Sequence, residues 1–126
     1  MLKVLVVDDE YYFRQALKVT IEWEKWGFEI CDEAKNGKIA LEKMNTLKPD
    51  IVIVDINMPV MDGLEFLHFL NELDINVKVI ILTGHSEFNY AKQAVQLGVY
   101  NYILKPIDED ELLKCLLDIK NTIKKN

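Results

Sequence analysis

Residues 51–63 read Ile51-Val52-Ile53-Val54-Asp55-Ile56-Asn57-Met58-Pro59-Val60-Met61-Asp62-Gly63. The four β-branched residues that open this stretch indicate a short strand buried on both faces, as at the centre of a parallel sheet. The strand ends at Asp55, and a lone carboxylate is costly to bury, so this side chain lies either in water at the sheet edge or opposite a cation. Pro59 excludes helical dihedral angles for the residue before it, and Asp62 followed by Gly63 marks a helix start.

Length, composition and charge limit the class of protein. A chain of 126 residues, half of them hydrophobic, fits one domain with a core that needs no metal or disulfide. No stretch approaches the roughly 18 apolar residues of a membrane span, and the N-terminus lacks a signal peptide, so we expect a cytoplasmic protein. A net charge of −6 argues against this domain itself binding a polyanion. Cys31 and Cys115 form no CxxC motif and are expected to be buried thiols.

Five apolar strands alternate with five amphipathic helices along the chain. The predicted strands are 2–7, 28–34, 51–54, 77–82 and 99–104, and a helix follows each of them. Alternation with short loops predicts an α/β fold: a five-stranded parallel sheet, doubly wound, with helices on both faces. A closed barrel would need eight such units, so the sheet is expected to be open.

The boundaries of the helices carry their own signals. Gly27 is predicted to end the first helix, with Trp23 and Trp26 clustered there. These tryptophans are interpreted as packing at the helix end rather than as a platform for a ligand. Ser86 is a candidate N-cap for the fourth helix, and Gly98 lies where a terminating glycine belongs.

Polar residues follow four of the five predicted strands. Asp8 and Asp9 follow the first strand, Asp55 the third, Thr83 the fourth and Lys105 the fifth. In open doubly wound sheets ligands bind beyond the carboxyl ends of the strands, so these residues should face one crevice. Three neighbouring carboxylates cannot all ionise cheaply without a cation. A hard divalent ion resolves this conflict, and Mg²⁺ is preferred because few protein ligands leave room for waters and phosphate oxygens.

This set of residues is suited to phosphoryl transfer. Asp55 would be an anionic nucleophile beside a Lewis acid, while Thr83 offers a hydroxyl donor and Lys105 a positive charge for phosphoryl oxygens. The product would be an acyl phosphate on Asp55. Taken singly, Asp8 or Asp9 could cap a helix, Thr83 could make a turn and Lys105 could be solvated. Their arrival at one end of one sheet favours the functional interpretation.

The sequence resembles, over its whole length, the CheY-like receiver domain of two-component response regulators, the phosphoacceptor partner of sensor histidine kinases. The resemblance is carried by the motifs at 6–10, 55–63, 82–84 and 105–106. It implies one receiver domain over residues 1–126, with the flavodoxin-like receiver fold and strand order 2-1-3-4-5. It also implies a signalling domain rather than an enzyme, one that catalyses only its own phosphorylation and dephosphorylation.

The resemblance also implies roles for single residues. Asp55 matches the phosphoacceptor, and Thr83 and Lys105 match the switch hydroxyl and the phosphate-binding lysine. Tyr102 matches the switch aromatic, and the bond before Pro106 matches one that is cis in the family. The ligands implied for Mg²⁺, or Mn²⁺, are Asp8, Asp9, Asp55 and the main-chain carbonyl of Asn57.

A finer resemblance concerns the kind of regulator. Residues 21–28 and 83–91 look like receivers whose regulators carry a C-terminal AraC-type helix-turn-helix domain. That output domain is absent from this sequence, so we expect an excised receiver in preference to a stand-alone one. The implied partners are a sensor histidine kinase and a second copy of the chain, bound on phosphorylation through the fourth helix, fifth strand and fifth helix. DNA would be bound only by the missing domain, for transcription regulation.

Three alternatives compete with the receiver interpretation. An aspartyl-phosphate phosphatase typically has a second acid two residues after its nucleophile, where this chain has Asn57. A dinucleotide- or flavin-binding module is disfavoured because the loop after the first strand has three acids and no glycine. A pseudo-receiver that acts through protein contacts alone would usually have lost one of the five polar residues.

His85 either orients a hydrolytic water or is an exposed loop histidine.

Overall fold

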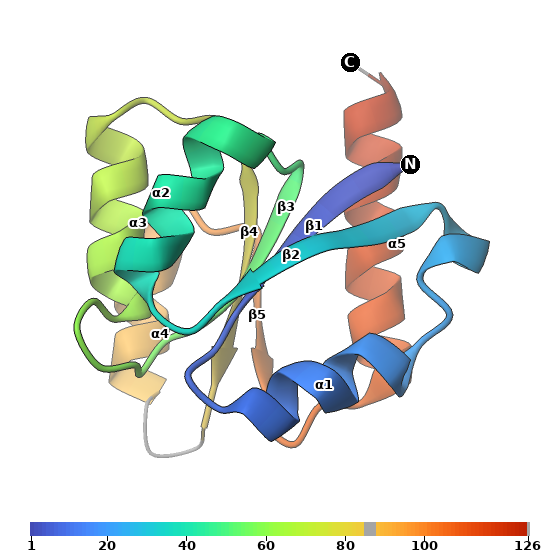
Figure 1. Ribbon diagram of the computed structural model, residues 1–126, viewed down its shortest axis with the longest axis horizontal. Coiled ribbons are helices and arrows are strands. Elements are labelled where there is room, and N and C mark those ends of the chain that lie inside the picture. The colour runs from blue at the N-terminus through green and yellow to red at the C-terminus, as the bar shows by residue number, and fades with distance from the viewer. Residues whose placement is uncertain (85–87, 126) are drawn as a thin grey trace.

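Five parallel strands form one sheet in the order β2-β1-β3-β4-β5 in the computed structural model, which describes residues 1–84 and 88–125 (Figure 1). The strands are β1 (Leu2–Val7), β2 (Phe28–Ala34), β3 (Ile51–Asp55), β4 (Lys78–Thr83) and β5 (Asn101–Leu104). The α-helices are α1 (Tyr11–Thr20), α2 (Gly37–Leu47), α3 (Gly63–Glu72), α4 (Phe88–Gln96) and α5 (Glu109–Lys125). The predicted fold and strand order are confirmed. Within the described ranges, no helix combines the length and apolar character needed to cross a bilayer.

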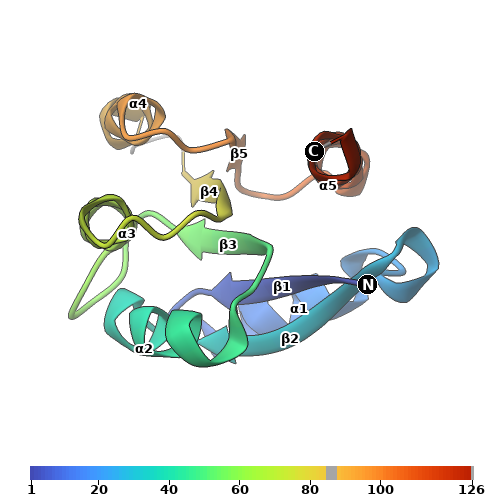
Figure 2. The ribbon, with the colours of Figure 1, turned by 90° about the horizontal axis from the view of Figure 1, so that it is seen from above.

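Helices cover both faces of the sheet. Figure 2 shows α1 and α5 on one face and α2, α3 and α4 on the other. Each face has its own apolar core, one centred on Phe66 and Met44 and the other on Leu17 and Leu116. All five residues of β3 are buried, because this central strand contacts both cores. Its carboxyl end is therefore held rigidly.

Side-chain caps begin three of the helices. Asn36 accepts a hydrogen bond from the main-chain N–H of Ile39, and Asp62 forms a capping box with Glu65 at the start of α3. Asp108 accepts hydrogen bonds from the first turn of α5. The predicted cap at Ser86 lies outside the described residues. The cap at Asp62 matters most for the site, because it ends the loop that follows Asp55.

The first helix is shorter than predicted. It ends at Thr20, not near Gly27, and a separate 3₁₀ turn spans Glu24–Trp26. The indole N–H of Trp23 donates a hydrogen bond to the carbonyl of Leu17. A side chain thus satisfies one of the carbonyl groups in the last turn of the helix. Trp23 is buried in the core, which confirms the interpretation of this tryptophan as a packing residue.

Both cysteines are free thiols. Cys115 is buried on α5, as predicted, and burial raises the pKa of its thiol to about 11. Cys31 is a free thiol but is only half-buried, because β2 is the edge strand of the sheet, so the prediction that this thiol is buried is wrong. Neither thiol is activated as a nucleophile.

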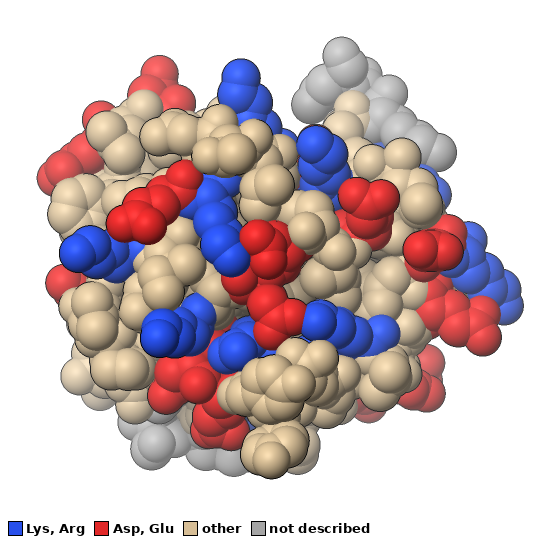
Figure 3. Space-filling model, in the orientation of Figure 1, with Lys and Arg blue, Asp and Glu red and all other residues tan. Residues whose placement is uncertain are grey.

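Charged side chains of both signs are interspersed over the face shown in Figure 3. An ion-pair network joins α1 to the edge strand. Arg14 Nε lies 2.7 Å from a carboxylate oxygen of Glu33, and Lys18 pairs with the other oxygen of the same carboxylate. Charged side chains on an edge strand disfavour its pairing with another chain.

Candidate functional site

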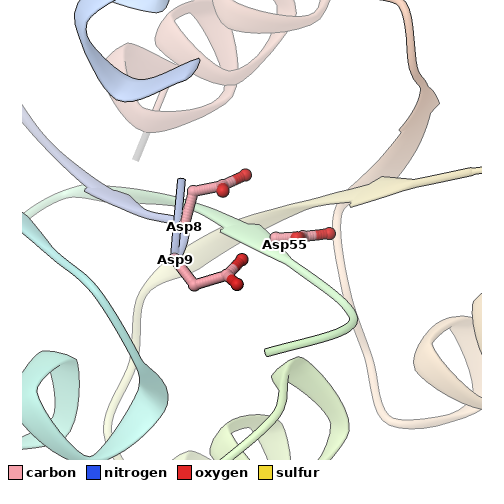
Figure 4. A group of neighbouring side chains, drawn as sticks. All are labelled: Asp8, Asp9 and Asp55. Atoms are coloured by element: carbon pink, nitrogen blue, oxygen red, sulfur yellow. The ribbon is translucent and has the colours of Figure 1, made fainter. Parts of the chain in front are cut away.

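Three carboxylates gather at the carboxyl ends of the two central strands. Asp8 and Asp9 follow β1 and Asp55 ends β3, and these strands pair in parallel with Val7 opposite Val54. Figure 4 shows the three carboxyl groups gathered where β1 and β3 end. One oxygen from each carboxylate lies within 4.8 Å of the others. Asp8 and Asp55 are buried, whereas Asp9 is exposed to solvent.

Lys105 joins this cluster from the end of β5. Its Nζ lies 2.9 Å from Oδ2 of Asp8 and 3.5 Å from Oδ2 of Asp55. The lysine's main-chain N–H donates a hydrogen bond to the carbonyl of Thr83, and its peptide bond to Pro106 is cis. The structure therefore brings together the acids and the lysine that the sequence placed at one edge of the sheet.

The electrostatics of the cluster leave it with surplus negative charge. Burial raises the pKa of Asp55 to about 6, and the neighbouring Asp8 adds to this effect while Lys105 opposes it. Burial alone would lower the pKa of Lys105, but its hydrogen bond to Asp8 and the charges of both carboxylates outweigh burial and raise it. One ammonium group does not neutralise three carboxylates. An all-oxygen, anionic ligand set of this kind fits a hard divalent cation such as Mg²⁺.

A cavity of about 300 Å³ opens beside the carboxylates. Its lining consists of Asp9, Glu10, Asp55, Asn57, Gly84 and Lys105. Since a water molecule occupies roughly 30 Å³ in the liquid, the cavity has room for a hydrated cation and a phosphoryl group together. Asp55 is the buried member of this lining, so a ligand that enters the cavity meets its carboxylate.

The backbone of Gly63, at the start of α3, lies very close to the backbone of Asp55 and Ile56 and so holds the loop between them. A Cβ atom at this position would lie 2.7 Å from the carbonyl oxygen of Asp55 and 2.8 Å from Cα of Ile56. The main-chain N–H of Gly63 donates a hydrogen bond to the carbonyl of Ile56. Only glycine allows α3 to begin this near the backbone of the acidic residue. The loop between them carries Asn57, whose main-chain N–H lies 3.5 Å from Oδ1 of Asp55.

Val60 in the same loop is strained, and we expect its replacement by glycine to stabilise the fold. Its φ is +69°, in the left-handed region that β-branched residues avoid, and its side chain is 74% exposed. Relief of this strain should exceed the added entropy of glycine in the unfolded chain, so Val60→Gly should raise the free energy of unfolding by about 1 kcal/mol. Urea denaturation measures this value.

Val19→Gly is the matched control, because Val19 is similarly exposed but lies in the regular helix α1. This control should be slightly destabilised, since glycine is a poorer helix former than valine. Equal loss of stability in both variants would contradict the strain argument.

Thr83 and Tyr102 lie on β4 and β5, the two strands that follow β3 in the sheet. Thr83 is fully buried at the end of β4, and its hydroxyl donates a hydrogen bond to the carbonyl of Gly84, 3.2 Å away. Tyr102 is half-buried on β5 and packs against the core that contains Phe66. The hydroxyl of Thr83 thus lies at the carboxyl edge and is bonded to the main chain of Gly84. His85 lies outside the described residues.

Two residues near the site were not anticipated as part of it. The ring centroid of Phe13 lies 4.2 Å from Nζ of Lys105, and Arg14 donates a 2.6 Å hydrogen bond from Nη1 to the main-chain carbonyl of Asp8. The sequence indicates Phe13 only as part of the apolar face of the first helix. Nothing in it links this ring to a lysine near the other end of the chain, and Arg14 carries no signal beyond its charge.

Comparisons with known proteins agree with this geometry. The family model for the response regulator receiver domain matches residues 4–117. The uncharacterized transcriptional regulatory protein YesN of Bacillus subtilis is 39% identical over 125 residues, which are 99% of this chain and 34% of YesN. The chain therefore spans about a third of the length of this relative.

Two solved structures are also similar over most of their length. A two component transcriptional regulator AraC from Clostridium phytofermentans is 31% identical, with a TM-score of 0.88 and coverage of 99% of this chain and 97% of that one. CheY in the CheX-CheY-BeF₃-Mg²⁺ complex of Borrelia burgdorferi is 31% identical, with a TM-score of 0.83 and coverage of 94% and 88%.

Proposed function

Because the chain belongs to the response regulator receiver domain family, we propose that it accepts a phosphoryl group on Asp55 from a phosphohistidine of a sensor histidine kinase. The observation that carries this proposal is the ion-paired cluster: Lys105 contacts both Asp8 and Asp55 at the mouth of one cavity. A buried, partly neutralised carboxylate at the end of a rigid strand is a well-placed acceptor.

The transfer step needs an attacking oxygen and stabilised phosphoryl oxygens. An oxygen of ionised Asp55 attacks phosphorus, the P–N bond to the imidazole breaks, and the imidazole leaves with the electron pair. Lys105 and the hydroxyl of Thr83 then bind oxygens of the transferred group. Water later cleaves the acyl phosphate and restores Asp55. In this proposal the domain catalyses these two reactions on itself alone, its own phosphorylation and dephosphorylation.

Magnesium, or manganese, is the cofactor that fits the acidic cluster. Its ligands in this proposal are the carboxylates of Asp8, Asp9 and Asp55 and the main-chain carbonyl of Asn57. When bound, the ion would offset the negative charge of the carboxylates and of the phosphoryl oxygens. The CheY of Borrelia burgdorferi, a structural relative, is described in a complex that contains Mg²⁺ and BeF₃.

Phosphorylation would switch the surface that is formed by α4, β5 and α5. The phosphoryl group draws the hydroxyl of Thr83 away from the carbonyl of Gly84, and the ring of Tyr102 moves into the space that it leaves. The affected surface of α4, β5 and α5 carries exposed apolar side chains, among them Tyr90, Val95 and Leu104. Apolar exposure of this kind suits a phosphorylation-dependent homodimer.

The output of the switch is proposed to be transcription regulation. YesN is described as a transcriptional regulatory protein, and a receiver similar to this one belongs to a two component regulator of the AraC type. In this proposal residues 1–126 form the receiver. A C-terminal AraC-type helix-turn-helix domain that follows it would make the contacts with DNA. The acidic receiver would supply the regulated dimerisation.

Intact-mass spectrometry tests the proposed function directly. The protein is incubated with phosphoramidate in excess Mg²⁺ or in EDTA, and part of each sample is then treated with hydroxylamine, which cleaves acyl phosphates. We expect one phosphoryl group per chain, added only with Mg²⁺ and removed by hydroxylamine. A chain that stays unmodified in both conditions would instead act as a pseudo-receiver, and turnover of phosphate esters would point to a phosphatase.

A further inference from the structure

The ammonium group of Lys105 has a third neighbour besides its two carboxylates. It lies 4.2 Å from the ring centroid of Phe13, well inside the distance at which a cation and an aromatic face attract each other. The ring comes from α1 and the lysine follows β5, so the contact joins two segments that are far apart in the sequence. Among the residues that the structure describes, three groups therefore hold this ammonium: two anions and one aromatic face.

The three contacts respond differently when the site is occupied. Asp8 and Asp55 are the same carboxylates that a divalent cation and a phosphoryl group would engage, so the lysine's ion pairs weaken when the site is filled. The Phe13 ring is neutral, binds no metal and makes no bond to the phosphoryl group. Its attraction for the ammonium persists while the carboxylates change partners.

The contact matters for Lys105 because its side chain, although largely buried, still reaches solvent. Its side chain is 23% exposed, and a lysine chain has several rotatable bonds that lead out into solvent. Phe13 itself is half-buried and packs against the core that contains Leu17, so this packing supports its ring. The ring beside the ammonium restricts where that ammonium can go once its ion pairs weaken.

We propose that Phe13 is a positioning residue that holds the ammonium of Lys105 at the mouth of the site during phosphoryl transfer to Asp55. This inference rests on the proposed function. Loss of the ring should slow transfer by roughly fivefold, as expected for one cation–π contact at a partly exposed position. The affinity for Mg²⁺ should change little, because the ring of Phe13 meets the cluster at the ammonium and not at a carboxylate.

The test compares Phe13→Leu, which keeps the apolar packing, with Phe13→Tyr, which keeps the aromatic face. Tyr12→Leu is the control, because Tyr12 is an exposed aromatic on the same helix. The first readout is the NMR shift of the Lys105 Hε protons in the metal-free protein. An aromatic face moves these protons upfield, so the displacement should be lost in Phe13→Leu and kept in Phe13→Tyr and Tyr12→Leu.

The second readout is the rate of phosphorylation by phosphoramidate in saturating Mg²⁺. Phe13→Leu should be about fivefold slower than the wild type, and Phe13→Tyr and Tyr12→Leu should be within about twofold of it. Denaturation in urea identifies any variant that is slow because it is unfolded, and rescue by tyrosine separates the ring from simple packing. Lys105 protons that are not displaced upfield in the wild type, or an unchanged rate in a folded Phe13→Leu variant, would overturn the role of Phe13 alone. A wild type that takes up no phosphoryl group would overturn the proposed function and this inference together.

Discussion

An Asp55→Asn variant is expected to take up no phosphoryl group and, without divalent metal, to be more stable than the wild type. An amide has no anionic oxygen for attack on phosphorus, so the first effect is complete loss. The second follows from burial, which raises the pKa of Asp55 to about 6. Above that pH the buried carboxyl group ionises, and its ionisation destabilises the folded state. The cost is about 1.4 kcal/mol for each tenfold difference in acid dissociation constant between the unfolded and folded states. Removal of this carboxylate should therefore stabilise the fold by roughly 2 kcal/mol near neutral pH.

The pH dependence of this difference has a defined sign. The folded-state pKa of Asp55 is raised above its ordinary value of 3.8, so the fold favours the protonated acid. The stability linked to this group is fully present below about pH 4 and is lost as the pH rises through about 6. The stability advantage of Asp55→Asn should thus be small near pH 4 and reach its full size near pH 7.

Urea denaturation in EDTA at several pH values measures the difference. The pKa values of Asp32 and Glu33 are lowered, chiefly by hydrogen bonds to Lys43 and to Lys18 respectively, and their titration affects both proteins equally. Asp118→Asn is the matched control, because it removes the same charge from an exposed position on α5. Mg²⁺ should narrow or reverse the difference, because it binds the wild type more tightly. Equal stability of Asp55→Asn and the wild type across this pH range would contradict the electrostatic argument.

The sheet and most of the site could be predicted because both depend on short stretches of sequence. A β-branched run that stops at Asp55 shows where the strand ends, and parallel pairing then brings Asp8 and Asp9 beside it. The cap at Asp62 was equally local, since it needs only a carboxylate three residues before an N–H. Each of these inferences uses residues close in sequence or a general rule for parallel sheets.

What escaped prediction depends on contacts between distant segments. The early end of α1 follows from the indole of Trp23 bonding back to Leu17, which sequence spacing does not reveal. The contact between the ring of Phe13 and Lys105 joins α1 to the residue that follows β5, two segments that are far apart in the sequence. The direction of the Thr83 hydroxyl depends on its hydrogen bond to the main-chain carbonyl of Gly84. Such details require the packed arrangement of side chains.

A Lys105→Met variant should show the opposite change in stability from Asp55→Asn. Methionine keeps an unbranched apolar chain over Phe13 but leaves the fully buried carboxylate of Asp8 without its 2.9 Å ion pair. Loss of one partner of a buried pair is strongly destabilising, and partial exposure of the lysine moderates the effect here, so we expect a loss of about 2 kcal/mol in EDTA. Phosphorylation by phosphoramidate should slow by roughly 100-fold, because a positioned charge on the phosphoryl oxygens is removed.

Mg²⁺ should act differently on the two variants, and this contrast isolates the role of the lysine. Lys105 competes with a divalent cation for Asp8 and Asp55, so its removal should tighten Mg²⁺ binding, measurable by titration calorimetry, and Mg²⁺ should restore the lost stability. Lys114→Met, at an exposed position on α5, is the control for charge and should change none of these values. In the double variant with Asp55→Asn the two stability changes should not add, because Nζ of Lys105 lies 3.5 Å from Oδ2 of Asp55. If Lys105→Met bound Mg²⁺ no more tightly than the wild type, the lysine and the metal would not share these carboxylates, and the proposed metal site would have to lie elsewhere.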